Sequence, residues 1–158
     1  MSKRLIIMRH AQSLPTSMTA DHERPLDEVG NKQAPKTAHQ LVQAHWIPDL
    51  VLCSDAKRTK ETWKLSAPIL GQVPIIFTHE LYHATVAQIL TLIKTKASDS
   101  QTLMLLGHNP TAEALATWLS TKALELGTAS AALLEADLDW SDILNIKGQW
   151  NFKKIITP

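Results

Sequence analysis

The stretch Leu5-Ile6-Ile7-Met8 is followed at once by Arg9-His10-Ala11-Gln12-Ser13. An uninterrupted apolar run is typical of a strand buried in a parallel sheet, and the abrupt change to polar residues marks its end. Ligands of parallel α/β sheets bind beyond the carboxyl ends of the strands. Arg9 and His10 therefore occupy a position at which such a sheet presents binding or catalytic side chains.

Short apolar runs alternate with helix-like segments along the rest of the chain. Further strands are expected over residues 49–53, 73–77, 102–106 and, more weakly, 131–135 and 152–156. Helices are expected over residues 33–46, 57–70, 84–97 and 111–124. This alternation predicts an α/β three-layer sandwich with a largely parallel central sheet flanked by helices. Pro74 favours an edge position for its strand, because proline cannot donate to a sheet ladder.

Pro35 bears on where the first helix begins. A proline inside a helix removes a backbone donor and crowds the preceding turn, so a helix that began near Asp27 would contain a defect. Either the helix begins near Gln33 or it is kinked at Pro35, and the later start is preferred.

The composition limits the class of protein. We expect the 158 residues to form a single domain, residues 1–158. Lys and Arg number 16 against 15 Asp and Glu, which lacks the basic excess of a nucleic-acid or membrane-surface binder, so neither partner is expected. Cys53 is the only cysteine, which predicts a buried, inert thiol and favours a reducing, cytoplasmic location. No apolar run reaches the roughly 18 residues that span a bilayer.

Two more predicted strand ends carry cationic residues. The strand at 49–53 leads into a helix start that contains Arg58, and the strand at 102–106 leads into Gly107-His108-Asn109-Pro110. Because the carboxyl ends of parallel strands meet at one edge of a sheet, we expect these residues to lie beside Arg9 and His10.

Two arginines and two histidines form a suitable pocket for a dianionic phosphoryl group. Guanidinium groups pair with phosphate oxygens in bidentate fashion, and turns at helix N-termini add backbone donors. A neutral imidazole beside two guanidinium groups has a lowered pKa, which keeps it nucleophilic at neutral pH. Such a nucleophile forms a covalent phosphoryl-enzyme that water hydrolyses, and this chemistry requires no metal or cofactor.

Three motifs in this order resemble those of a known family. Arg9-His10-Ala11 resembles the Arg-His-Gly motif of the histidine phosphatase superfamily, which has the phosphoglycerate-mutase-like fold. Residues 54–59 resemble its second-arginine motif, and residues 107–110 resemble its second-histidine motif. The short length and the segments at 24–26 and 48–51 are similar to the small bacterial phosphohistidine phosphatase branch, the SixA type. The resemblance covers nearly the whole chain.

The resemblance implies a role for each motif residue. His10 would be the nucleophile, and Arg9, Arg58 and His108 would bind the phosphoryl oxygens. Family members often carry an acidic residue after the third strand that protonates the leaving group, and Glu80 lies in the matching region. An ordinary surface carboxylate is the alternative for Glu80.

The roles of Arg24 and Ala11 each have two interpretations. Arg24 is expected either to bind an anion near the mouth of the site or to form a surface salt bridge. Ala11 replaces the glycine of the motif, and alanine would be strained there if the backbone needs a positive φ. No metal is expected, because no two of the remaining histidines show a reliable metal-ligand spacing with a carboxylate or cysteine partner. His79 and His83 have a spacing that a helix would turn into a metal pair, but a loop that enters a helix is the preferred interpretation.

The length of the chain bears on the substrate. In this family, mutases and sugar bisphosphatases carry extra segments that enclose a small substrate, and 158 residues leave little room for them. Imidazole leaves more easily than a serine alkoxide, which favours protein phosphohistidine, such as that of a histidine phosphotransfer domain. The alternatives are a phosphatase for phosphoserine or small phosphate esters, and a non-catalytic phosphoprotein-binding module that Ala11 would permit.

Overall fold

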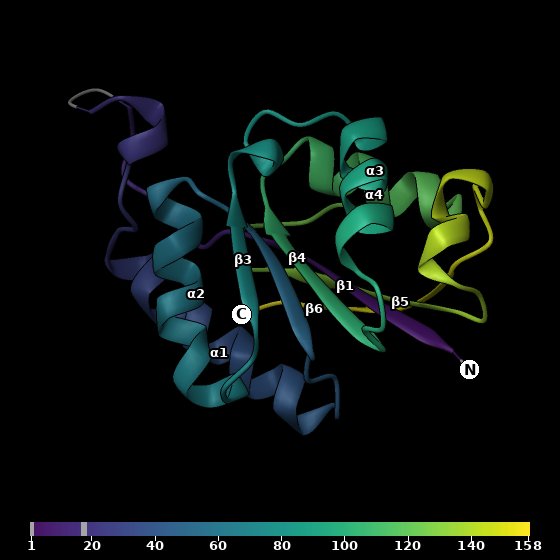
Figure 1. The fold of residues 1–158 in the computed structure, drawn as a ribbon. Coiled ribbons are helices and arrows are strands. Elements are labelled where there is room, and N and C mark those ends of the chain that lie inside the picture. The colour runs from purple at the N-terminus through teal and green to yellow at the C-terminus, as the bar shows by residue number, and fades with distance from the viewer. Residues whose placement is uncertain (1, 17–18) are drawn as a thin grey trace.

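The computed structural model describes residues 2–16 and 19–158, which contain a six-stranded sheet with helices on both faces (Figure 1). The strands are β1 (Lys3–Arg9), β2 (Leu50–Ser54), β3 (Ile75–Thr78), β4 (Thr102–Gly107), β5 (Ala131–Ala136) and β6 (Asn151–Ile156). Their order across the sheet is β3-β2-β4-β1-β5-β6. The first four strands are mutually parallel, and the last two pair in antiparallel fashion. The predicted largely parallel sheet and the edge position of β3 are confirmed.

Four helices complete the layers. Helices α1 (Glu28–Gln43) and α2 (Lys57–Leu70) lie on one face, while α3 (Val86–Lys96) and α4 (Thr111–Ser120) lie on the other (Figure 1). Alternate residues of β1 supply the two cores: Leu5 and Ile7 pack with α3 and α4, whereas Ile6 and Met8 pack with α1 and α2. Three short 3-10 helices, η1 (Asp21–Glu23), η2 (His79–Leu81) and η3 (Trp140–Asn145), lie between these elements. The predicted three-layer sandwich is confirmed.

The prediction that the first helix begins near Gln33 is wrong. Helix α1 begins at Glu28 and contains Pro35. Oδ1 of Asp27 caps the helix by accepting the N–H of Gly30 at 2.8 Å. The same Asp27 donates its backbone N–H to the carbonyl of Gln12, at 3.0 Å. The cap and this contact with the loop after β1 offset the backbone hydrogen bond that Pro35 cannot make.

The remaining boundaries differ little from the predicted ones. Helix α2 has the predicted bounds, and α3 lies within the predicted range. Helix α4 ends at Ser120 rather than Leu124, because Thr121 adopts a left-handed conformation with φ of 61°.

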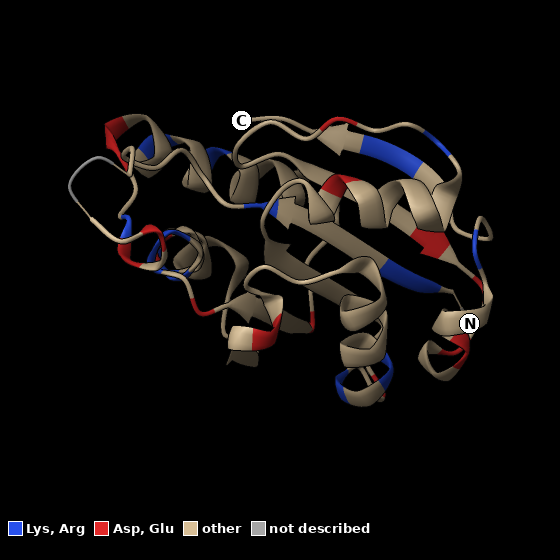
Figure 2. Ribbon diagram, turned by 90° about the horizontal axis from the view of Figure 1, so that it is seen from above, with Lys and Arg blue, Asp and Glu red and all other residues tan. Residues whose placement is uncertain are grey.

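Charged residues are distributed over many elements, with basic and acidic positions interspersed (Figure 2). This arrangement agrees with the near balance of the two kinds of residue in the sequence. Within the described part of the chain, no helix has the length and apolar character that crossing a bilayer demands.

Candidate active site

The carboxyl ends of β1, β2 and β4 meet as predicted, and they bring His10, Arg58 and His108 together. Arg9 pairs with Gly107 in the β1–β4 register, and the next residue, His10, donates its backbone N–H to the Gly107 carbonyl at 3.0 Å. The imidazole rings of His10 and His108 are consequently 5.3 Å apart, centroid to centroid. Arg58 reaches the same point from the first turn of α2.

His10 is held as a neutral imidazole whose ring lone pair lies on Nε2. Its Nδ1 lies 2.7 Å from the carbonyl oxygen of Ala11, which can only accept, so Nδ1 carries the hydrogen. Nε2 accepts the Nε–H of Arg58 at 3.3 Å. Burial lowers the pKa of His10 to about 4, and the charges of Arg58 and Arg9 act in the same direction. The ring therefore stays unprotonated at neutral pH, with its lone pair on Nε2.

His108 and Arg9 each have a buried polar atom without a partner: Nδ1 of His108 and Nε of Arg9. Nε2 of His108 lies 2.8 Å from Oγ of Ser54. Oγ of Ser54 also accepts the Ala56 N–H, at 3.2 Å. Unpartnered buried polar atoms are unusual in folded proteins. A ligand bound in the site would be one source of the missing partners.

Burial lowers the pKa values of both His108 and Arg9. Burial lowers the pKa of His108 to about 3, and the charge of Arg58 adds to the effect. Burial also lowers the pKa of Arg9, which Glu113 partly opposes. Nη1 of Arg9 donates to the Leu126 carbonyl at 3.2 Å, a contact that holds the guanidinium at the end of β1.

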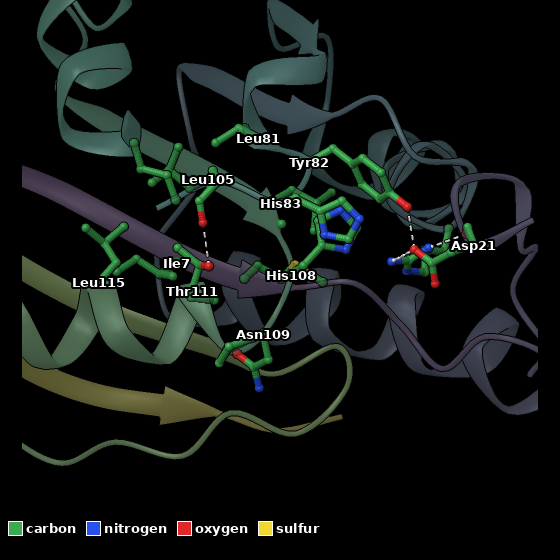
Figure 3. A pocket seen from close by; sticks show the side chains of 18 of the residues that line it. Ile7, Asp21, Leu81, Tyr82, His83, Leu105, His108, Asn109, Thr111 and Leu115 are labelled. Atoms are coloured by element: carbon green, nitrogen blue, oxygen red, sulfur yellow. Dashed lines mark hydrogen bonds and ion pairs between the residues drawn. The ribbon is translucent and has the colours of Figure 1, made fainter. Parts of the chain in front are cut away.

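Asp21 fixes the position of Arg58. Two nitrogens of Arg58 donate to Asp21, one to the backbone carbonyl at 2.7 Å and one to Oδ2 at 3.2 Å. The Tyr82 hydroxyl donates to the same Oδ2 (Figure 3). This hydrogen bond, followed by the charge of Arg58, holds the pKa of the Asp21 carboxyl well below its usual range. Asp21 therefore remains ionised and keeps the guanidinium beside His10.

Asp21 and Tyr82 could not be recognised as site residues from the sequence. Asp21 precedes Arg24 by one helical turn, and Tyr82 is the only tyrosine of the chain. Neither fact is specific enough to assign a role. Their contribution appears only in the folded chain, where η1 packs against α2 and the Tyr82 hydroxyl reaches Asp21.

A cavity of about 420 Å³ opens beside the two histidines. Arg58, Tyr82 and His108 line its polar part, whereas Ile7 and Leu115 belong to its apolar wall (Figure 3). The predicted residues Arg9, His10 and Glu80 are not part of the described lining. The cavity is therefore adjacent to the cationic cluster and shares Arg58 and His108 with it.

The two remaining predicted site residues, Glu80 and Arg24, differ in how close they lie to the cationic cluster. Glu80 is exposed on η2. Arg24 lines the cavity, but its guanidinium is engaged by protein groups: Nη2 lies 2.9 Å from Oδ1 of Asp21, and Nη1 donates to Ser13 Oγ and the Leu14 carbonyl, each at 2.8 Å. The salt bridge expected for Arg24 is observed, and its binding of an anion stays a prediction.

Ala11 fits its position without backbone strain. It is buried and is not among the described residues with positive φ. Its N–H donates to Oγ1 of Thr62 at 3.0 Å. The close approach in this loop occurs instead at Gly30, where a Cβ atom would lie 2.1 Å from the carbonyl oxygen of Gln12. The glycine that the loop requires therefore lies on α1.

Comparisons with known proteins agree with this geometry. The family model of the histidine phosphatase superfamily (branch 1) matches residues 5–88. An uncharacterised chloroplastic protein of Arabidopsis thaliana is 34% identical over 171 residues, which cover 99% of this chain and 78% of that protein.

Solved structures give the same result. A candidate phosphohistidine phosphatase SixA from Agrobacterium tumefaciens superposes with a TM-score of 0.84 at 26% identity, over 99% of this chain and 98% of that one. The protein histidine phosphatase SixA in complex with tungstate superposes with a TM-score of 0.81 at 20% identity, over 98% of this chain and 96% of that one. The fold predicted from the three motifs is confirmed.

Proposed function

Because the chain belongs to the histidine phosphatase superfamily, we propose that it is a phosphatase that removes the phosphoryl group from phosphohistidine in a protein. The observation that carries the proposal is the state of His10. Its Nδ1–H is held by the Ala11 carbonyl, and its Nε2 lone pair lies next to Arg58. This is the tautomer that a nucleophilic imidazole needs.

The proposed reaction has two steps. Nε2 of His10 forms a bond to phosphorus as the bond from phosphorus to the leaving nitrogen breaks, and the leaving imidazole takes a proton from a water molecule, which becomes hydroxide. A second water molecule then attacks the phosphorylated His10, which releases hydrogen phosphate, neutral His10 and a proton that neutralises the hydroxide. Arg58, Arg9 and His108 bind the phosphoryl oxygens; the charges of the two arginines and the hydrogen bonds of all three residues stabilise both transition states. The unpartnered Nε of Arg9 and Nδ1 of His108 support this assignment.

Phosphohistidine as the substrate is supported by the leaving group and by the relatives. Imidazole is a better leaving group than an alkoxide, and Glu80, the expected acid, is exposed outside the described cavity lining. The two solved proteins compared above carry the name of a phosphohistidine or protein histidine phosphatase. A histidine phosphotransfer domain is the proposed partner. We also propose a cytoplasmic location, which the single, buried and free Cys53 supports.

One observation favours a second candidate function. The cavity of about 420 Å³ has the size of a small-molecule site. A phosphatase for small phosphate esters would use this cavity for the organic part of the ester, whereas a phosphoprotein would leave much of it unfilled. The two functions differ in their preferred substrate and share the chemistry at His10.

Turnover of matched substrates tests the proposal. Wild type, His10→Ala and the surface control His39→Ala are compared on a phosphohistidine phosphotransfer domain, a phosphoserine peptide and an aryl phosphate, with EDTA present. We expect the phosphohistidine protein to be hydrolysed with the highest kcat/KM, His39→Ala to match wild type, and His10→Ala to be inactive. An alkaline quench should trap phosphate on wild type but not on His10→Ala. A preference for the aryl phosphate would overturn the substrate assignment, and activity of His10→Ala would overturn the mechanism.

Glu80→Gln tests the acid separately. We expect its rate on the phosphohistidine protein to stay within about twofold of wild type, because a single exposed carboxylate outside the cavity contributes little to proton transfer. A loss of about 100-fold or more, the range of a lost general acid, would instead give Glu80 the catalytic role that the family resemblance implies.

A further inference from the structure

Three side chains from distant parts of the chain meet next to the phosphoryl pocket. His22 of η1 lies with its Nε2 2.8 Å from Oδ1 of Asp55, and His79 of η2 lies with its Nδ1 3.1 Å from both carboxylate oxygens. The ligand atoms of the three residues are all within 4.8 Å of one another. Their separations in sequence are 33 and 24 residues, so no local spacing reveals the cluster.

The backbone holds this arrangement in place. The N–H of Asp55 donates to the carbonyl of Thr78 at 3.2 Å, which extends the β2–β3 ladder to the residue before His79. The side chain of Thr78 then caps η2. His22 packs edge-on against Tyr82, with ring centroids 4.8 Å apart. The three ligand groups are thus positioned before any ion binds.

The surroundings of His22 are those of a metal ligand. A histidine that binds a metal through one ring nitrogen commonly presents the other to a carboxylate, which fixes the tautomer and raises the basicity of the ring. Nε2 of His22 faces the cluster, and its Nδ1 lies 3.6 Å from Oε1 of Glu23. At 3.6 Å this contact is an ion pair and not a hydrogen bond, so Glu23 is the nearby carboxylate that could become the outer partner of His22.

We propose that His22, Asp55 and His79 form a binding site for a divalent transition-metal ion of the zinc type. Two imidazole nitrogens and one carboxylate oxygen suit Zn²⁺ or Co²⁺ and not Mg²⁺ or Ca²⁺, which take oxygen ligands. A tetrahedral Zn²⁺ with bonds of about 2.0–2.2 Å separates its ligand atoms by roughly 3.3 Å, which lies within the range of separations in the cluster. Water fills the fourth position.

The bound ion would join η1, the β2–α2 turn and η2. Asp21, which holds Arg58, also belongs to η1. By fixing η1, the ion would therefore stabilise the position of Arg58 in the phosphoryl pocket. It is separate from the proposed chemistry at His10, which involves none of the three ligands.

Metal titration of the purified protein tests the site independently of phosphatase activity. Isothermal titration with Zn²⁺ and the visible absorption of bound Co²⁺ are measured for wild type, His22→Ala, Asp55→Asn and His79→Ala. We expect one tetrahedral site per chain in wild type and its loss in each variant. Glu23→Gln should weaken binding by about tenfold, the effect of a lost outer-shell carboxylate. Mg²⁺ should not compete.

Two variants serve as controls. His83→Ala removes a histidine next to the cluster but outside it and should bind Zn²⁺ like wild type, and His10→Ala should do the same if the ion is not held in the phosphoryl pocket. Circular dichroism confirms folding of each variant; His79 is the safest to change, because its side chain is 71% exposed. Unchanged Zn²⁺ binding by His79→Ala, or loss of binding in His10→Ala alone, would overturn the proposal.

Discussion

The Nε–H group of Arg58 donates to Nε2 of His10 across 3.3 Å, so the atom proposed to attack phosphorus is in contact with a fixed cation. The other two guanidinium nitrogens of Arg58 donate to Asp21. Burial is the main reason that the pKa of His10 is lowered, and the Arg58 cation acts in the same direction. The cation also lies where the phosphoryl group would bind. The position of Arg58, set by Asp21, therefore affects both the nucleophile and the binding of the substrate.

Asp21→Asn should reduce kcat/KM by about 10- to 100-fold, which corresponds to a lost charge-assisted hydrogen bond of about 1.5–3 kcal/mol. The amide keeps the shape of the side chain but no longer pairs as an anion with Arg58 and Arg24. Steady-state kinetics on the best substrate measures the effect. The exposed Glu28→Gln, a change of the same kind outside the site, should behave like wild type. Equal rates for Asp21→Asn and Glu28→Gln would show that Asp21 does not position Arg58.

Stability should fall as the pH is lowered from 6.5 towards 4. The pKa of His10 is about 4 in the folded protein against an ordinary value of 6.5, so between these limits the unfolded chain binds more protons at this residue. Its contribution is complete above pH 6.5 and decreases by about 1 kcal/mol for each pH unit below that. Urea unfolding at pH 7.5 and pH 5 measures the change.

His10→Gln isolates this contribution from that of other groups. The pKa of His22 is raised, chiefly by its hydrogen bond to Asp55, so the stability that His22 contributes has the opposite pH dependence. This effect cancels when the two proteins are compared. The variant should lose less stability than wild type between pH 7.5 and pH 5. The same loss in both would mean that burial does not hold His10 neutral.

Gly30→Ala should destabilise the protein by about 2 kcal/mol or more and lower activity. The new Cβ atom would lie 2.1 Å from the Gln12 carbonyl oxygen, so the loop that follows His10 has to move. Thermal unfolding and kcat are the two measurements. Gly127→Ala is the matched control, because its Cβ would lie at an ordinary 3.6 Å from Oγ of Ser130. Comparable effects of the two substitutions would contradict the role of the close approach.

Ala11→Gly should not increase activity by more than about twofold and should cost up to about 1 kcal/mol of stability. Ala11 does not have a positive φ, so glycine would relieve no backbone strain there. Glycine also increases the conformational entropy of the unfolded chain, which lowers stability. Kinetics and unfolding of the single variant are sufficient. Activity that appears only with glycine would support the alternative of a non-catalytic binding module.

The convergence of the cationic residues was predictable because it depends on the sheet. Parallel strands place the residues after them at one edge, so the apolar runs before Arg9, Arg58 and His108 sufficed to bring those three together. The start of α1 was not predictable from Pro35, because the cap at Asp27 and the contact with Gln12 form only in the folded chain.

The residues that hold the cationic side chains in place could not be predicted from the sequence. Asp21 and Tyr82 come from separate turns and meet through a hydrogen bond between side chains 61 residues apart. The cluster of His22, Asp55 and His79 has the same origin. Periodicity describes strands and helices, whereas these contacts depend on how short connecting turns pack on one another.

The pairing of β1 with β4 separates the site into a part that the sheet fixes and a part that connecting turns carry. The distance between His10 and His108 is set by the spacing of two paired strands, whereas Tyr82 and Asp21 are carried by turns. Exchanging the turns at residues 19–24 and 79–85 for those of a relative, with Asp21 retained to hold Arg58, would therefore alter substrate choice while the two histidines keep their separation. A transplanted pair of turns is thus a practical route to new substrates on an unchanged catalytic base.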